Sequence, residues 1–153
     1  MAARPHRPGV PRPVAQVTAL EFWVSGRPAP QGSKRHVGNG RMLEMSKYVA
    51  GWRAAVKAEA TRQAADWVLL DEPCWLRVGF YLQRPKAPKF PDRPGVTPDL
   101  SKLVRATEDA LTGVAWSDDS RVVSTLAEKF WAGDLGPGAF IRVSTEELRK
   151  GAA

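Results

Sequence analysis

The chain has few of the residues from which several common kinds of site are built. Cys74 is its single cysteine, so no disulfide can form within the chain. Its two histidines, His6 and His36, have no metal-ligand spacing, which argues against a zinc site. No apolar run approaches the roughly 18 residues that a membrane-spanning helix requires. The basic N-terminus has no apolar block behind it, so we expect no secretory signal and a reducing cytoplasm.

Basic residues, by contrast, are in excess. Lys and Arg number 23 against 16 Asp and Glu, which gives a formal net charge of +7 in 153 residues. The excess is clustered rather than spread, which favours an anionic partner such as nucleic acid over a surface charged for solubility alone. The length fits one domain that can bury a core without covalent cross-links.

Composition divides the chain into a tail and a folded domain. Residues 1–15 are rich in proline and arginine, a composition that neither forms a helix nor buries a core. We therefore predict a disordered basic tail over residues 1–15 and a single domain over residues 16–150. The tail can either improve solubility or make weak, sequence-blind contacts with phosphates.

Hydrophobic periodicity predicts six elements within the domain. Strands are expected at residues 17–24, 74–83, 121–131 and 139–144, and helices at residues 46–65 and 99–111. Ser46 is the expected N-cap of the first helix, and residues 145–150 can add a short helical turn. The order β–α–β–α–β–β predicts an α+β fold, a single layer of mixed sheet with two main helices packed on it.

Two of the predicted loops are basic. The loop over residues 26–41 carries Lys34 and Arg35, and glycines that allow close approach to a ligand. The loop over residues 84–98 lies directly before Asp99, as a phosphate-backbone substrate would require, and its Phe90 is a candidate wedge for a DNA branch point. Its cations, all predicted DNA contacts, are Arg84, Lys86, Lys89 and Arg93.

Carboxylates and cations gather around the second predicted helix. Asp99 stands at its start, Lys102 and Arg105 lie on one polar stripe, and Asp118 and Asp119 follow in a turn. Each aspartate alone would be an ordinary cap or turn residue. If the third strand enters the sheet near the helix N-terminus, the acids would meet and bind Mg²⁺ or Mn²⁺. The ion would activate water and Arg105 or Lys102 would stabilise charge on the phosphorus.

The motifs in this region resemble those of a known family. The patterns P-D-L-x-K-L-x-R, D-A-L-T-G and W-x-D-D-x-x-V-V, between Pro98 and Val123, are similar to those of the RusA-type crossover junction endodeoxyribonucleases. These are Holliday junction resolvases of phage and prophage origin. The likeness covers most of residues 20–145, including Gly26 with Pro28 and the R-P-K segment that begins at Arg84. It implies a cytoplasmic, nucleoid-associated homodimer that binds four-way DNA junctions and cuts them with Mg²⁺.

The resemblance also assigns roles. Asp99 corresponds to the first metal-binding aspartate of the family and Asp119 to its essential aspartate, with Asp118 beside it as a further ligand. Arg105 stands where many members have a catalytic lysine, and arginine can hold phosphate but not donate a proton as lysine does. Lys102 is expected to contact DNA.

Ser101 departs from the family pattern, which usually reads D-x-D. A hydroxyl is a poor ligand for a hard dication. Three outcomes are open: the three aspartates suffice, Glu108 or Glu128 replaces the absent acid, or catalysis is weak while junction binding is retained. The leading hypothesis is a metal-dependent, structure-selective endonuclease, and the alternative is a non-catalytic junction-binding protein. A small basic interaction domain, with aspartates that serve as caps and turns, is a third.

Overall fold

The computed structural model describes residues 18–32 and 47–146. This part of the chain forms a four-stranded sheet, two helices and one turn of 3₁₀ helix. In chain order these are β1 (Ala19–Ser25), α2 (Val49–Gln63), β2 (Cys74–Leu82), α3 (Leu100–Leu111), η1 (Asp119–Arg121), β3 (Val122–Trp131) and β4 (Gly138–Ser144). The predicted α+β fold, a single mixed sheet with two helices packed on it, is confirmed.

The strands lie in the order β1-β4-β2-β3. Strand β4 pairs antiparallel with both β1 and β2, whereas β2 and β3 run parallel. Parallel neighbours need a crossover rather than a tight turn, and α3 lies in this crossover. As a result, the chain passes from the end of β2 along α3 and returns to begin β3, which is an edge strand of the described sheet.

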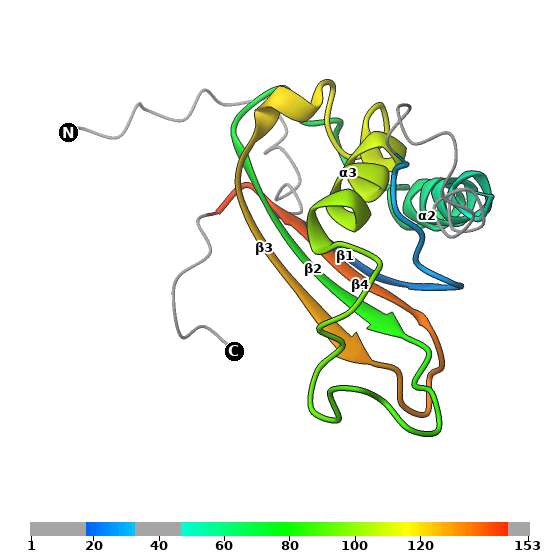
Figure 1. Cartoon of the computed structure of the whole chain (residues 1–153). Coiled ribbons are helices and arrows are strands. Elements are labelled where there is room, and N and C mark those ends of the chain that lie inside the picture. The colour runs from blue at the N-terminus through cyan, green and yellow to red at the C-terminus, as the bar shows by residue number, and fades with distance from the viewer. Residues whose placement is uncertain (1–17, 33–46, 147–153) are drawn as a thin grey trace, which may run out of the picture.

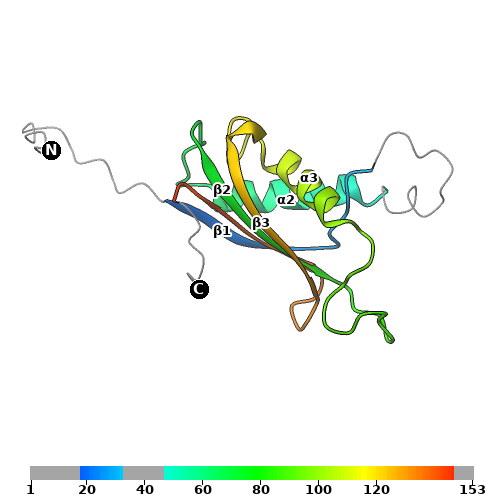
Figure 2. The ribbon, with the colours of Figure 1, turned by 60° about the vertical axis from the view of Figure 1, so that its left-hand side comes forward.

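Both helices pack on the same face of the sheet (Figures 1 and 2). Apolar side chains of the two helices meet alternate residues of the central strands there, among them Leu76 and Ile141, which are fully buried. Trp52 of α2 donates from Nε1 to Oγ1 of Thr107 on α3 at 3.2 Å. This bond satisfies two buried polar groups and fixes the two helices relative to each other.

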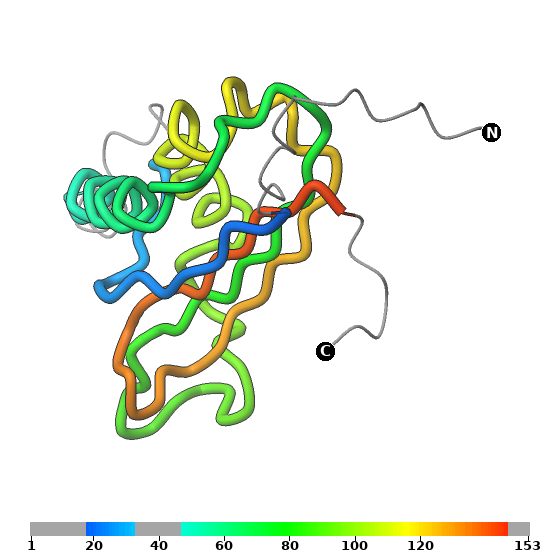
Figure 3. Tube along the Cα trace, turned by 180° about the vertical axis from the view of Figure 1, so that it is seen from behind, coloured from blue at the N-terminus to red at the C-terminus, as the bar shows by residue number. Residues whose placement is uncertain are grey.

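The opposite face carries aromatic rings from three of the strands. Figure 3 shows the backbone of the sheet from behind, turned by 180° from the view of Figure 1. Trp23 of β1 meets Tyr81 of β2 edge to face, with ring centroids 5.3 Å apart. Tyr81 stacks on Phe130 of β3 at 5.0 Å. Gly79 leaves room for these rings, because a Cβ there would lie 3.2 Å from the Phe130 ring.

The element boundaries agree with the sequence-based predictions to within three residues at each end inside the described ranges. The predicted N-cap Ser46, the predicted tail over residues 1–15 and most of the predicted turn over 145–150 lie outside those ranges. Helix α2 instead begins after Tyr48. None of the described helices is long and apolar enough to cross a membrane.

Candidate active site

Asp99 is the N-cap of α3. Its backbone is extended, with φ −66° and ψ 135°, and among the described residues its side chain makes no capping hydrogen bond. The carboxylate is 56% exposed and lies 3.6 Å from Nζ of Lys102, one turn along the helix. Asp99 therefore presents an accessible carboxylate, which a metal ion requires, beside a cation of the kind that pairs with an anionic substrate.

Lys129 approaches the same end of α3 from strand β3. Its Nζ donates to the carbonyl oxygens of Val96 at 2.7 Å and Pro98 at 3.0 Å. Burial lowers the pKa of Lys129, and the negative charge of Asp99 acts in the opposite direction. Lys129 was not predictable as a site residue, because nothing in the sequence pattern of its strand distinguishes it from a solvent-facing lysine.

The second acidic group lies where η1 leads into β3. The side chain of Asp118 accepts a hydrogen bond from the backbone N–H of Ser120 at 2.8 Å. Hydrogen bonding with the side chain of Ser120, and then with this N–H, lowers the pKa of Asp118. Asp71, which the sequence did not single out, accepts from Ser117 Oγ at 2.8 Å and from Arg121 Nε at 2.9 Å. These contacts lower the pKa of Asp71 and hold the acidic turn in one conformation.

Glu108 of α3 faces this acidic turn. Partial burial, and then the negative charges of Asp119 and Asp109, raise the pKa of Glu108. Asp119 is therefore close to Glu108, and the turn that contains Asp118 and Asp119 lies beside the C-terminal part of α3. Glu108, one of the two acids considered as substitutes at Ser101, therefore lies with Asp119 and not with Asp99. Glu128, the other, is paired with Arg93 at 3.2 Å.

The two acidic groups do not meet within the chain. Glu108 follows Asp99 by nine residues, and a helix rises 1.5 Å per residue, so about 14 Å of helix separates them. Strand β3 begins at the C-terminal end of α3, and Figure 1 shows η1 at one end of the sheet and the loop before α3 at the other. The condition under which the acids would meet, that the third strand enters the sheet near the helix N-terminus, is not fulfilled, because β3 starts beside the C-terminal part of α3 and its Lys129, near the other end of the strand, reaches Pro98.

The carboxylates of this site suit a divalent metal ion, but within one chain they are not gathered around a common point. Carboxylate oxygens are the ligands that Mg²⁺ and Mn²⁺ prefer. In residues 18–32 and 47–146, however, no three Asp, Glu, His or Cys side chains gather closely enough to hold an ion. Arg105 lies exposed on α3 between the two acidic groups, and Ser101 is exposed in its first turn. Each end of α3 offers only part of a metal-binding set.

The basic loop over residues 84–98 is fixed to the last residues of β3. Arg93 donates to Glu128 Oε2 at 3.2 Å and to the carbonyl of Lys129 at 3.1 Å, and its guanidinium lies 4.1 Å above the Phe130 ring. Trp131 donates from Nε1 to the carbonyl of Phe90 at 2.9 Å. The side chain of Arg93 is thus engaged within the protein, and its predicted contact with DNA stays a prediction.

The other predicted DNA contacts differ in their surroundings. Arg84 donates to the carbonyl of Pro91 at 2.7 Å, whereas Lys86 and Lys89 are exposed. Phe90, beside them, is 45% exposed and rests against Gly95, where a Cβ would lie 3.3 Å from the ring. Lys34 and Arg35 lie outside the described residues.

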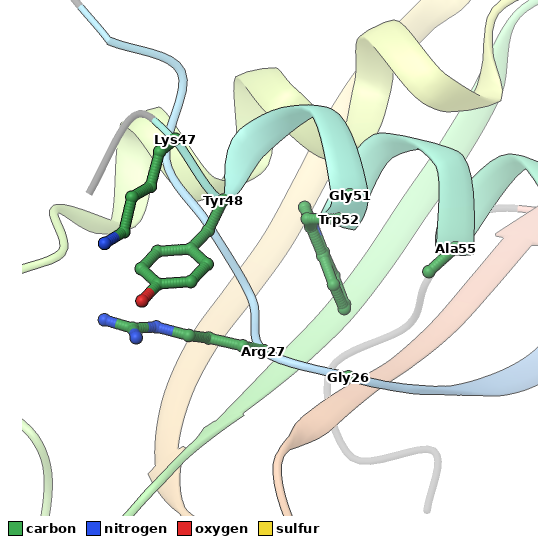
Figure 4. A pocket seen from close by; sticks show the side chains of 7 residues that line it. All are labelled: Gly26, Arg27, Lys47, Tyr48, Gly51, Trp52 and Ala55. Atoms are coloured by element: carbon green, nitrogen blue, oxygen red, sulfur yellow. The ribbon is translucent and has the colours of Figure 1, made fainter. Parts of the chain in front are cut away.

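A cavity of about 250 Å³ lies beside the N-terminus of α2 (Figure 4). The guanidinium of Arg27 lies 4.0 Å from the centre of the Tyr48 ring, and Nζ of Lys47 lies 5.0 Å from it. Of the described residues that line the cavity, none is acidic. The segment that follows Arg27 reaches the Asp99 end of α3, where the N–H of Gln31 donates to the carbonyl of Lys102 at 3.0 Å. The chain therefore connects a basic surface to the first acidic group.

A family model of the endodeoxyribonuclease RusA matches residues 25–144. The chain belongs to the RusA endodeoxyribonuclease family. It is also 28% identical over 129 residues to the uncharacterized protein YqaN of Bacillus subtilis (strain 168), an alignment that covers 74% of this chain and 88% of that protein. The RusA match includes both acidic groups, Lys129 and the loop over residues 84–98, and it confirms the family to which the sequence motifs pointed.

Proposed function

We propose that this RusA-family chain is a Mg²⁺- or Mn²⁺-dependent endonuclease that resolves four-way DNA junctions by phosphodiester hydrolysis. The observation that carries the proposal is the family match over residues 25–144, which spans Asp99 at the start of α3 and Asp119 in η1. Asp99 and Asp119, with Arg105, are the proposed catalytic residues, and Asp99, Asp118 and Asp119 the proposed metal ligands. An excess of seven positive charges supports a DNA substrate.

We further propose that the protein acts as a homodimer and that the carboxylate set is completed between protomers. A symmetric junction needs two cuts, and a twofold pair supplies two sites. A twofold axis that sets the two α3 helices antiparallel brings the Asp99 end of one protomer to the Asp119 end of its partner. In such a dimer, the two acidic groups that about 14 Å of helix separates within one protomer would meet across the interface.

The edge strand β3 supports association on this side of the molecule. Its residues 123–126 are all exposed, and two of them are aliphatic. Val123 is 56% exposed and Leu126 47%, directly after the acidic turn. Exposed aliphatic side chains on an unpaired sheet edge favour pairing with another chain.

Cleavage of a synthetic four-way junction tests the proposed activity. Wild-type protein with Mg²⁺ is expected to cut symmetrically related strands, and Asp99→Asn and Asp119→Asn to reduce the rate by at least about a hundredfold while junction binding persists. Asp134→Asn, in the exposed turn between β3 and β4, is the matched control. Equal cleavage by the wild type and Asp119→Asn would rule out the assignment.

Mixing the two inactive variants tests the shared site. A heterodimer of Asp99→Asn with Asp119→Asn retains one intact pair, Asp99 from one protomer and Asp119 from its partner. After subunit exchange, about half of the dimers are mixed and each has one working site, so about a quarter of wild-type cleavage is expected. If both acids of a site came from the same protomer, mixing would restore nothing.

Ser101 motivates the alternative function, a junction-binding protein that does not cut. The side chain is exposed two residues after Asp99, where the family pattern has a second carboxylate. A gel shift of the four-way junction without cleavage, in either Mg²⁺ or Mn²⁺, would favour this alternative. A Ser101→Asp variant that then gains cleavage would assign the missing activity to this position.

A further inference from the structure

The two carbonyl groups that Lys129 holds belong to the residues leading directly into Asp99. Within the first turn of α3, the amide N–H of Lys102 donates to the carbonyl of Asp99 at 3.1 Å. The carbonyl of Pro98 is therefore left for the Lys129 ammonium, which it accepts at 3.0 Å. The carbonyl of Val96 accepts from the same ammonium at 2.7 Å. One side chain from β3 thus clamps the end of the loop to the start of the helix.

Neighbouring residues of β3 hold the rest of the loop. Glu128 and the Lys129 carbonyl accept from Arg93, and Trp131 donates to the carbonyl of Phe90. Strand β3 therefore holds both the loop with the exposed Lys86 and Lys89 and the backbone that leads into Asp99.

We propose that Lys129 is the positioning residue of Asp99, fixing the backbone on which this carboxylate stands relative to the DNA-facing loop. This inference rests on the proposed function, because it assigns Asp99 to the active site. The side chain of Asp99 makes no capping bond among the described residues, so its orientation depends on the backbone beneath it. That backbone is held by two charge-assisted hydrogen bonds from a partly buried ammonium.

Lys102 provides the matched comparison. It also carries a positive charge close to Asp99, with Nζ 3.6 Å from the carboxylate, but that contact reaches the side chain and not the backbone. Removing Lys102 takes away a charge beside Asp99, whereas removing Lys129 also leaves two carbonyl groups without their donor. Lys129→Met and Lys102→Met therefore separate positioning from charge.

The experiment measures junction affinity in EDTA, the single-turnover cleavage rate, and trypsin cleavage within the loop. Trypsin does not cut before proline, so its sites in residues 84–98 are the bonds after Lys86 and Lys89. Lys129→Met is expected to cut the junction ten- to a hundredfold more slowly, to bind it within about threefold of wild type, and to expose both bonds to faster trypsin cleavage. Lys102→Met is expected to leave trypsin cleavage in the loop unchanged, and, because Lys102 is itself a predicted DNA contact, to weaken junction binding in EDTA where it slows junction cleavage.

Conservative variants complete the test. Lys129→Arg can donate to both carbonyls and is expected to recover at least part of the cleavage rate and the protection from trypsin. Lys129→Gln is too short to reach both, and replaces Lys129→Met if that variant fails to fold. The proposal is overturned if Lys129→Met matches the wild type in both measurements, or if Lys102→Met loses as much of both. Absence of wild-type cleavage would refute the proposed function, and the trypsin comparison would still decide whether Lys129 holds the loop.

Discussion

Asp119 and Glu108 lie close enough for the negative charge of the aspartate to raise the pKa of the glutamate. Partial burial acts in the same direction and is the larger cause. The acidic turn before β3 therefore lies beside the C-terminal part of α3. A cation or a proton bound between these two carboxylates would reduce their repulsion, and such pairs are typical of functional sites.

Replacing Glu108 by Gln is expected to stabilise the fold at neutral pH. The folded-state pKa of Glu108 lies above its ordinary value of 4.5, so the fold favours the protonated form. Relative to the variant, the wild type is therefore most stable below pH 4.5, and it loses stability as the pH rises through the raised pKa. Thermal unfolding at pH 4 and pH 7 is expected to reveal a gain of about 1–3 °C for the variant at the higher pH alone.

Asp134→Asn is the control for this comparison, because Asp134 is exposed in the turn after β3. Its effect on the unfolding temperature is expected to be similar at both pH values. A Glu108→Gln variant whose stability relative to wild type is the same at pH 4 and pH 7 would contradict the raised pKa of Glu108.

The fold was predictable because its signals are local. Alternating apolar residues define β2 and β4, and the apolar arc of Leu103, Thr107 and Leu111 defines the buried face of α3. Each such signal needs only a short stretch of sequence. The acidic motifs were likewise visible, because Asp99 and Asp119 stand in patterns that carry a family resemblance.

The arrangement of the site was not predictable in the same way. Whether Asp99 meets Asp119 depends on the direction in which α3 crosses the sheet, and no residue of either motif encodes that direction. Lys129 and Arg93 act through backbone carbonyls more than thirty residues away in sequence, and a carbonyl carries no sequence signature. Such contacts follow only from the pairing of β3 with β2.

Gly138 is predicted to be essential for pairing β4 with β1. A Cβ at this buried position would collide with the backbone carbonyl of Val24 and with the indole of Trp23. Gly138→Ala is therefore expected to cost about 3 kcal/mol of unfolding free energy, a fall of roughly 6–12 °C in the unfolding temperature. Gly133→Ala is the control, since no described atom lies within 4 Å of its Cβ position. An equal fall for both glycines would argue against this packing.

Removing divalent ions is predicted to separate binding from cleavage. Contacts between cationic side chains and phosphates need no metal ion, so a junction gel shift is expected to survive EDTA with an affinity change of about threefold or less. Cleavage is expected to cease and to return when Mg²⁺ or Mn²⁺ is added in excess. Cleavage that continues at its full rate in EDTA would contradict metal dependence while leaving the RusA family assignment intact.

The exposed lysines of the loop and the engaged Arg93 are predicted to respond differently to salt. Each lost contact with a duplex phosphate lowers the slope of log affinity against log salt concentration by about 0.9. Lys86→Ala and Lys89→Ala, whose side chains are exposed, are each expected to lower the junction-binding slope by about this amount. Arg93→Ala is expected to lower the slope less than Lys89→Ala does and to hasten trypsin cleavage in the loop, because Arg93 is bound to Glu128 and the Lys129 carbonyl. A slope for Arg93→Ala that falls as far as that of Lys89→Ala would mean that Arg93 releases these partners to contact DNA.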